Sequence, residues 1–267
     1  MFDAYFDASG KEEDSDIKYV AVSGFAAKAG LWKDWEREWL DCLDRKHILN
    51  KHGLPEFHMV DCANYSKFFE GWETKEDERQ KLLHELVEII NTYLGRKISC
   101  VVSIDDYQKC IDADLRDAFG ISGAYVIGGR TCAARVKEWG RIDGVPSMSQ
   151  TQFFLEDGDG DVQQNNLLER LMEDEFPKPN FKRKKNKYSK LGELLESRLI
   201  PFQASDVWAY LSFLHVRNGT RSWGPKENIH WMLTDLSQIP EPIFTFDETF
   251  LRGFNKLLRI CKDIPIY

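Results

Sequence analysis

The chain opens with two strand-like segments, and this opening constrains its fold more than any other feature of the sequence. Residues 2–8 and 18–27 consist mainly of aromatic, β-branched and small apolar residues, a composition that favours strands. A polar segment with Gly10 and the run Lys11 to Asp16 separates them, as expected for a turn. We therefore predict a β-hairpin, onto which the rest of the chain must add further strands or helices.

Two helices are predicted next along the chain. Residues 31–48 form an amphipathic segment whose large apolar side chains recur at helical spacing, namely Leu31, Trp35, Trp39 and Leu43. Thr74 and Asp77 resemble a capping box, which predicts a second helix from there to Gly95.

The later segments complete an alternation of strands and helices. Strands are expected at 97–104 and 151–156, helices at 120–139, 162–176, 201–216 and 246–262, and a mobile basic loop at 178–190. The small residues of the 120–139 helix would permit close packing. The pattern predicts a single α/β domain over 1–267, with a mixed sheet, helices packed on its faces, and 211–267 as a helical C-terminal extension.

Composition limits the class of protein. The 267 residues are 42% hydrophobic and 13% aromatic, which indicates a folded core rather than disorder. Lys and Arg number 36 against 44 Asp and Glu, a net charge of −8, and this argues against broad, non-specific adhesion to nucleic acid. Without a long apolar run or a secretory signal, and with scattered cysteines, we expect a cytoplasmic protein with reduced thiols and no membrane partner.

Three carboxylates occupy positions from which a catalytic site can be built. Asp7 ends the first strand, Glu156 ends a later strand, and Asp206 lies near the start of a late helix. Carboxylates at strand ends converge at one edge of a sheet, and divalent cations relieve their repulsion. Such cations activate a water and stabilise the leaving oxygen of a phosphodiester. The alternative is that these acids are ordinary surface or capping residues.

Two further clusters are candidates for function. Glu56, His58 and Asp61 lie within six residues in EFHMVDC, and such a cluster can supply a metal ligand, a proton shuttle or a phosphate contact. The basic run contains Lys184, Lys185 and Lys187, which would guide a phosphate backbone towards the metals. The alternatives are a structural histidine and a solvated loop.

Several common site types are excluded or disfavoured. Asp157, Asp159 and Asp161 alternate as in a calcium loop, but Val162 and Leu168 stand where that loop needs Gly and Glu. A zinc site would have to use residues whose spacing matches no standard pattern, namely Cys42, His47, His52, His58 and Cys62. The absence of a Walker motif, G-x-G-x-x-G and G-x-S-x-G removes the usual support for ATP-driven, dinucleotide-dependent and serine-hydrolase functions.

Four motifs together resemble the domain of unknown function 3800 family in order and approximate spacing. They are YFDASG (5–10), EFHMVDC (56–62), FFLEDGD (153–159) and PFQASDVWAY (201–210). The corresponding family motifs are Y-x-D-E-S-G, E-x-H-x-x-D, F-E-D-G-D and Q-x-A-D-x-x-A-Y. Two departures are Ala8, where the family has Glu, and Ser205, where it has Ala.

The resemblance implies a ribonuclease-H-like fold and a metal-dependent nuclease or a related phosphoryl-transfer enzyme that uses Mg²⁺ or Mn²⁺. By motif position it implies Asp7, Glu156, Asp157 and Asp206 as metal ligands, His58 as a catalytic residue, and Ser9, Glu56, Asp61 and Gln203 as supporting residues. The Glu missing at position 8 leaves an alternative from another class. This alternative is a non-catalytic module that binds nucleic acid or a protein partner, in a defence or toxin-like system. The sequence is also compatible with a homodimer.

Overall fold

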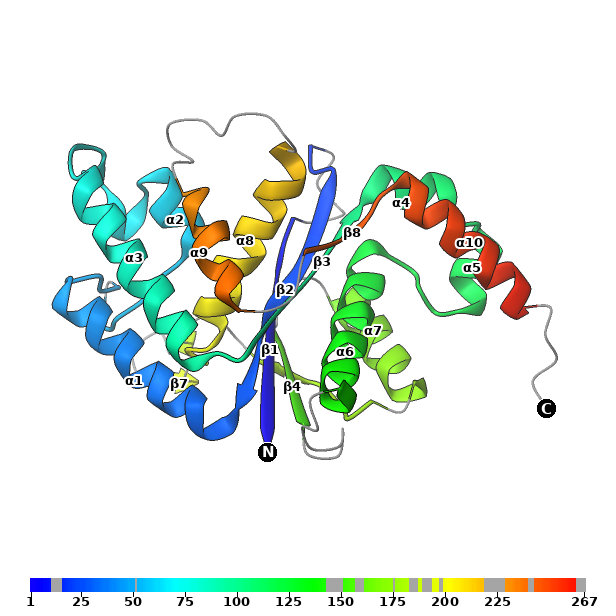
Figure 1. Ribbon diagram of the computed structural model, residues 1–267, viewed down its shortest axis with the longest axis horizontal. Coiled ribbons are helices and arrows are strands. Elements are labelled where there is room, and N and C mark those ends of the chain that lie inside the picture. Colours follow the sequence, from blue (N-terminus) through cyan, green and yellow to red (C-terminus); the bar gives the residue numbers. More distant parts are fainter. Residues whose placement is uncertain are drawn as a thin grey trace.

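The computed structural model describes residues 1–10, 16–50, 52–142, 151–156, 161–174, 176–182, 187–188, 194–196, 199–218, 229–239 and 243–262. A mixed six-stranded sheet lies at the centre, with helices on both of its faces (Figure 1). The predicted α/β class and the central mixed sheet are therefore confirmed.

The sheet has the strand order β5-β4-β1-β2-β3-β8. Its strands are β1 (Phe2–Ser9), β2 (Tyr19–Lys28), β3 (Arg96–Ser103), β4 (Thr151–Glu156), β5 (Asn180–Lys182) and β8 (Ile243–Phe246). The first three strands pair antiparallel, which confirms the opening hairpin. The other three run parallel to their neighbours: β4 to β1, β5 to β4 and β8 to β3. A separate two-stranded sheet pairs β6 (Lys187–Tyr188) with β7 (Leu194–Glu196).

One face of the sheet is covered by a helical layer rich in tryptophan. Its longer helices are α1 (Ala29–Arg45), α3 (Glu76–Tyr93) and α8 (Phe202–Asn218), joined by the shorter α2 (Met59–Asn64), α9 (Trp231–Asp235) and 3₁₀ turns η1 (Lys67–Phe69), η2 (Trp72–Thr74) and η5 (Leu236–Gln238). The amphipathic character of α1 is confirmed, but Trp32 is buried and Leu31 is 38% exposed. The buried face of this helix therefore contains Trp32, whereas the sequence predicted Leu31.

The other face carries a second layer of helices. These are α4 (Ile104–Cys110), α5 (Ala113–Ala118), α6 (Ala124–Ile142), α7 (Asp161–Glu173) and α10 (Glu248–Lys262). The close packing expected of α6 is present, because a Cβ atom at Gly128 would lie 3.0 Å from Val22 on β2, and one at Gly129 would lie 2.6 Å from Leu167 on α7. The glycines thus bring α6 directly onto the sheet and onto its neighbouring helix.

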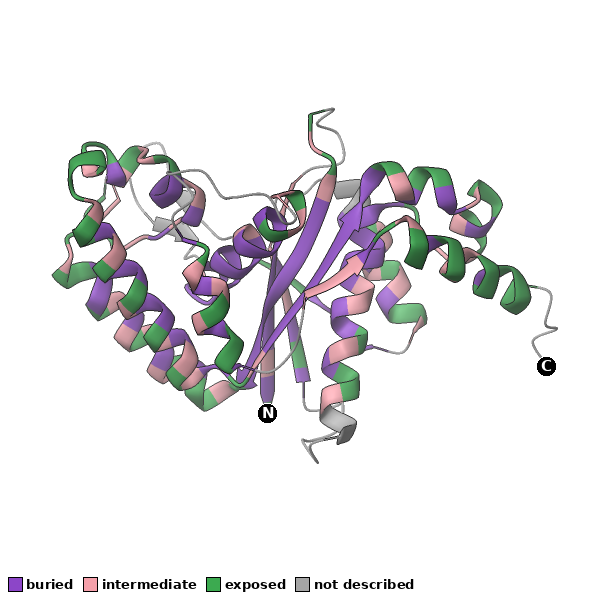
Figure 2. Cartoon of the chain, turned by 45° about the horizontal axis from the view of Figure 1, so that its top comes forward, coloured by how far each residue is buried: buried purple, intermediate pink, exposed green. Residues whose placement is uncertain are grey.

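The two layers give the molecule two hydrophobic clusters separated by the sheet. Tyr5 belongs to the cluster on the α8 side and Phe6 to the cluster on the α6 side, because successive strand residues point to opposite faces. Figure 2 shows that the central strands and most of α8 are buried. A helix buried on nearly every side sits deep in the core, so α8 can position polar side chains beside the sheet.

Three local predictions are corrected by the structure. The prediction of a capping box is wrong, because the Thr74 hydroxyl donates to the Gly71 carbonyl and α3 begins after Lys75 without a side-chain cap. Residues 211–267 are not purely helical, because β8 joins the main sheet, and position 211 falls inside α8. The basic segment is not entirely loop, because residues 180–182 extend the sheet as β5.

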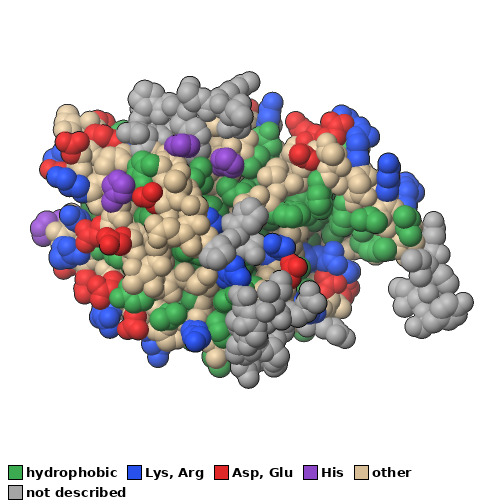
Figure 3. All heavy atoms as spheres, in the orientation of Figure 1, with side chains coloured by type: hydrophobic (Ala, Val, Ile, Leu, Met, Phe, Trp, Pro, Cys, Tyr) green, Lys and Arg blue, Asp and Glu red, His purple; other side chains and the backbone are tan. Residues whose placement is uncertain are grey.

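Helix α10 has apolar side chains that are exposed to solvent. Phe250, Leu257 and Ile260 are 38%, 60% and 59% exposed, whereas Leu251 and Leu258 on the same helix are buried. Hydrophobic side chains gather on this side of the molecule in Figure 3. No helix within the described part of the chain is long and apolar enough to cross a membrane.

Candidate functional site

Two of the predicted carboxylates lie on neighbouring strands. Phe6 of β1 pairs with Leu155 of β4 in a parallel register, so the next position on each strand brings Asp7 beside Glu156. Both point to the face on which Tyr5 stacks on Phe154, with ring centroids 4.6 Å apart, because strand side chains alternate between faces. Asp7 is buried and Glu156 is half-buried. The strand ends therefore place two acids together under the α8 layer.

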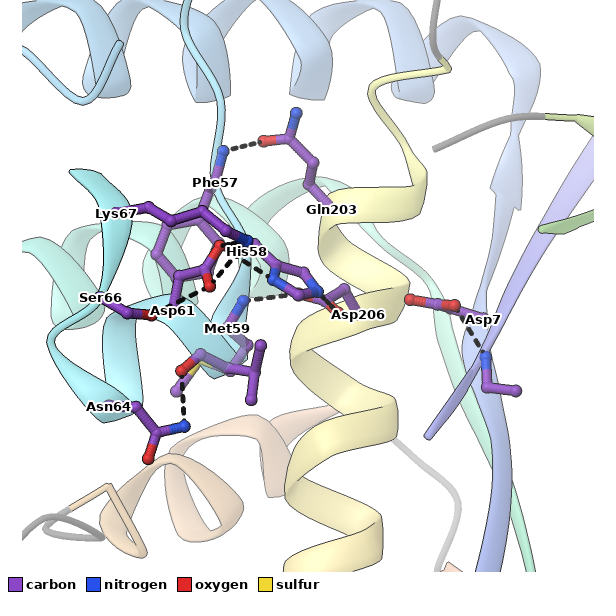
Figure 4. Close-up of polar contacts among 12 residues, drawn as sticks. Asp7, Phe57, His58, Met59, Asp61, Asn64, Ser66, Lys67, Gln203 and Asp206 are labelled. Carbon is purple, nitrogen blue, oxygen red and sulfur yellow. Dashed lines mark hydrogen bonds and ion pairs between the residues drawn. The ribbon is translucent and has the colours of Figure 1, made fainter. Parts of the chain in front are cut away.

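Helix α8 carries the third acid to the same side of the sheet. The Ser205 hydroxyl donates a 2.8 Å hydrogen bond to the Tyr5 carbonyl and ties the helix to β1. Asp206 follows directly and is buried. Figure 4 shows the Asp7 carboxyl group directed from β1 toward α8. Ser205, one of the two departures from the family motif, thus contributes a contact that alanine would not make.

His58 lies between two carboxylates. Its Nδ1 atom is 3.1 Å from Asp61 Oδ2, and its Nε2 atom is 3.3 Å from Asp206 Oδ1 (Figure 4). Both carboxylates accept a hydrogen bond from the ring at once only when both ring nitrogens carry a proton. The His58 side chain is 21% exposed, against 7% for Asp206. The imidazole is therefore the more accessible partner of this pair.

The backbone on either side of His58 is bound to α8. Phe57 N donates to Gln203 Oε1 at 3.0 Å, and Met59 N donates to Asp206 Oδ2 at 2.6 Å. Residues three apart share one face of a helix, and alternate N–H groups of an extended segment point the same way. Gln203 and Asp206 consequently hold the extended chain at His58 as a neighbouring strand would.

Asp61 is itself surrounded by donors. Ser66 Oγ donates to Asp61 Oδ1 at 3.1 Å, and Lys67 Nζ lies 3.0 and 2.8 Å from the two carboxylate oxygens. Burial acts to raise the pKa of Asp61, but the hydrogen bond from Lys67, the nearby His58 and the Ser66 hydroxyl together hold that pKa below its usual value. These contacts stabilise the charged carboxylate beside His58.

The remaining predicted residues lie elsewhere or outside the described structure. Glu56 accepts a 2.7 Å hydrogen bond from Asn50 and belongs to the loop before α2. Ser9 is half-buried at the end of β1. Asp157, Lys184 and Lys185 lie outside the described residues, and Lys187 is described only as part of the β6 backbone.

Sequence reasoning missed Ser66 and Lys67. Helix α2 ends at Asn64, and Tyr65 then takes a left-handed conformation with φ 52°. This turn carries Ser66 and Lys67 back to a carboxylate in the first turn of the helix. A regular helical pattern cannot reveal such a return, and a single Ser-Lys pair is too common in sequences to be a signal.

The carboxylates have the chemistry of a magnesium or manganese site, since both ions prefer oxygen ligands. Asp206 already contacts Met59 and His58, and Asp7 Oδ1 accepts a 2.8 Å hydrogen bond from the backbone N of Ala8. Among the residues described, no group of three or more His, Cys, Asp or Glu side chains is placed to hold a metal ion. The described part of the fold brings suitable ligands to one side of the sheet without closing them into such a group.

All six cysteines are free thiols, and five of them are buried. Burial raises the pKa of Cys42 and of Cys62 to about 12. Because the thiolate is the reactive form, these thiols are suited to packing rather than to nucleophilic chemistry.

Comparisons of the chain with models of known families, with curated proteins and with solved structures find no match. The resemblance to the domain of unknown function 3800 family therefore rests on the four sequence motifs alone.

Proposed function

We propose that the chain is a cytoplasmic, metal-dependent nuclease of ribonuclease-H-like fold, which hydrolyses phosphodiester bonds of nucleic acid. The observation that carries this proposal is the placement of Asp7 beside Glu156 on β1 and β4, under the helix that carries Asp206. Three acids from distant parts of the chain thus lie on one side of one sheet. A mixed sheet with helices on both faces is also the architecture that the motif resemblance implies.

Asp7, Glu156 and Asp206 would hold Mg²⁺ or Mn²⁺, with Asp157 as a further ligand. When bound, the ion supplies an activated water and stabilises the leaving oxygen. His58 would act as the general acid or base, because imidazole is the side chain that most often transfers protons in catalysis, and its partly exposed ring lies beside Asp206. Lys184, Lys185 and Lys187 would contact the phosphate backbone, which requires cationic side chains.

Cleavage of labelled single- and double-stranded DNA and RNA, in Mg²⁺, Mn²⁺ or EDTA, tests the nuclease. We expect metal-dependent cutting that falls by about 100-fold or more in Asp7→Asn and Asp206→Asn. Asp41→Asn, which changes an exposed acid on α1, is the matched control and should cut like the wild type. Cutting that persists in EDTA, or in both site variants while they remain folded by circular dichroism, contradicts the proposal.

One observation favours the alternative function, a non-catalytic module that binds nucleic acid or a protein partner. The described side chains do not form a ready group of metal ligands. Calorimetry with Mn²⁺ separates the two functions, because the nuclease should show heat of binding that Asp7→Asn abolishes. Nucleic-acid binding without cutting or Mn²⁺ uptake would favour the module, and its affinity should fall with salt. Binding to a protein partner should depend less on salt.

A further inference from the structure

We infer that Asp61, Ser66 and Lys67 form a positioning unit that holds the His58 ring against Asp206. The inference rests on the proposed function in that His58 is placed there as the proton-transferring group. None of the three residues is proposed to touch substrate. Each acts through His58, either directly or by way of the Asp61 carboxylate.

The backbone contacts at His58 do not by themselves orient its ring. Gln203 and Asp206 bind the N–H groups of Phe57 and Met59, which leaves both side-chain torsions of His58 to be set by other contacts. Asp61 lies three residues on, in the first turn of α2, and meets Nδ1 at 3.1 Å. That contact leaves Nε2 directed at Asp206. A carboxylate on one ring nitrogen is a common means of fixing the tautomer and direction of the other.

Asp61 can act in this way only if it stays charged and stationary in a buried position. The Asp61 side chain is 6% exposed, whereas that of Lys67 is 54% exposed. The ammonium group reaches the buried carboxylate from the surface and contacts both of its oxygens. A buried carboxylate without such a partner is costly and tends to take up a proton. Lys67 therefore keeps Asp61 in its charged form. Ser66 Oγ restrains Asp61 Oδ1, the oxygen that does not face His58.

The backbone that presents these two donors is strained. Tyr65 and Lys67 both have φ 52°, in the left-handed region that residues other than glycine seldom adopt. Two such residues within three positions persist only where the surrounding structure compensates for them, and they are often found at functional sites. Here the strained turn brings Ser66 Oγ and Lys67 Nζ to the Asp61 carboxylate. Ending the helix would not by itself require these two contacts.

The direct test is the nuclear magnetic resonance signature of the His58 ring in the full chain, with isotope-labelled histidine at one fixed pH. His58→Gln assigns the ring signals. We expect Lys67→Met and Asp61→Asn to shift or broaden the His58 signals while the other histidines keep theirs. Lys67→Arg should retain the wild-type signals, because arginine restores a cation at this position. Lys81→Met, which changes an exposed lysine on α3, is the control and should leave the His58 signals unchanged.

Unchanged His58 signals in both Lys67→Met and Asp61→Asn would overturn the inference. Thermal unfolding of each variant shows whether the fold is intact, and Asp61→Asn alone provides the test if Lys67→Met prevents folding. A shift of the His58 signals in Lys67→Arg equal to that in Lys67→Met would also count against it, because positioning through charge predicts rescue.

Cleavage kinetics separate this inference from the nuclease proposal. If the wild type cuts nucleic acid, Lys67→Met should lower kcat about tenfold at nearly constant KM, and Lys67→Arg should restore it. A raised KM with unchanged kcat and unchanged His58 signals would mean that Lys67 contacts phosphate directly, and positioning would be wrong. If the wild type cuts nothing, the nuclease proposal fails, but the ring signals still decide whether Asp61 and Lys67 position His58.

Discussion

Gln203 joins three segments of the chain through one side-chain oxygen. Its Oε1 atom accepts a 2.9 Å hydrogen bond from Trp39 Nε1 on α1 and a 3.0 Å hydrogen bond from Phe57 N, while the residue itself belongs to α8. Trp39, Phe57 and Gln203 are all buried, so no water can replace this acceptor without a change in packing. The side chain thus links the helix of Asp206 to the segment of His58.

We predict that Gln203→Leu lowers the free energy of unfolding by about 2–4 kcal/mol, because two buried donors lose their acceptor. Urea unfolding measures this change. Gln108→Leu, at an exposed position of α4, is the matched control and should stay within about 0.5 kcal/mol of the wild type. A Gln203→Leu protein as stable as that control would show that Oε1 does not hold the two donors.

At the scale of one element, helix α3 starts with a network of charged and polar groups in place of a capping side chain. Glu76 accepts hydrogen bonds of 2.6–2.9 Å from Arg79, Gln80 and Tyr65. The Arg79 side chain is fully buried and lies 5.1 Å from the centre of the Tyr65 ring. The hydrogen bond from Arg79 is the main reason that the pKa of Glu76 falls to about 2.

This shift predicts a specific loss of stability in acid. The pKa of Glu76 in the folded chain lies below its ordinary value of 4.5, so the stabilisation is complete above that pH and is lost as pH falls through 4.5 toward 2. Unfolding free energies of the wild type should therefore fall more steeply from pH 5 to pH 2.5 than those of Glu76→Gln. Because Glu76 is partly exposed, we expect a difference on the order of 1 kcal/mol.

Urea titrations at several pH values measure the two slopes. Asp77→Asn removes the neighbouring, exposed acid of the same first turn and should keep the slope of the wild type. Equal slopes for the wild type and Glu76→Gln would contradict the paired state of Glu76.

At the scale of the whole molecule, the sheet lies between two hydrophobic clusters of buried residues. Strands β1, β2 and β3 contribute alternate residues to both, as with Ala21 and Val22 on β2. If either helical layer unfolded, it would expose one face of strands against which the other layer still packs. We therefore predict that both layers unfold in one cooperative transition, as small domains commonly do.

Hydrogen exchange followed by mass spectrometry at increasing urea concentration tests this prediction. Peptides from α8 report on the tryptophan-rich cluster and peptides from α6 report on the other. Both should lose protection at the same urea midpoint. If α6 opened well before α8, the two layers would be separate stability units, and the sheet would not transmit unfolding between them.

The parts of the fold that were predicted correctly are those with a strong local pattern. Aromatic, β-branched and small apolar residues identified β1 and β2, β-branched residues identified β3, and apolar residues at helical spacing identified α1. The failures occurred where tertiary contacts outweigh local preference. Ile243–Phe246 is too short to stand out as a strand but pairs with β3, and Thr74 bonds to the turn before it instead of capping α3.

The sequence by itself determined which residues are candidates for the site, because acids at strand ends and the E-x-H-x-x-D motif are visible in local patterns. Only the tertiary structure decided which of them meet. The register of β1 against β4 places Asp7 next to Glu156, and the docking of α8 brings Asp206 to Met59, 147 residues away in the chain. The left-handed turn after α2 brings Lys67 to Asp61. Strand register and helix docking depend on the packing of two hydrophobic layers, and no local periodicity encodes contacts over such distances.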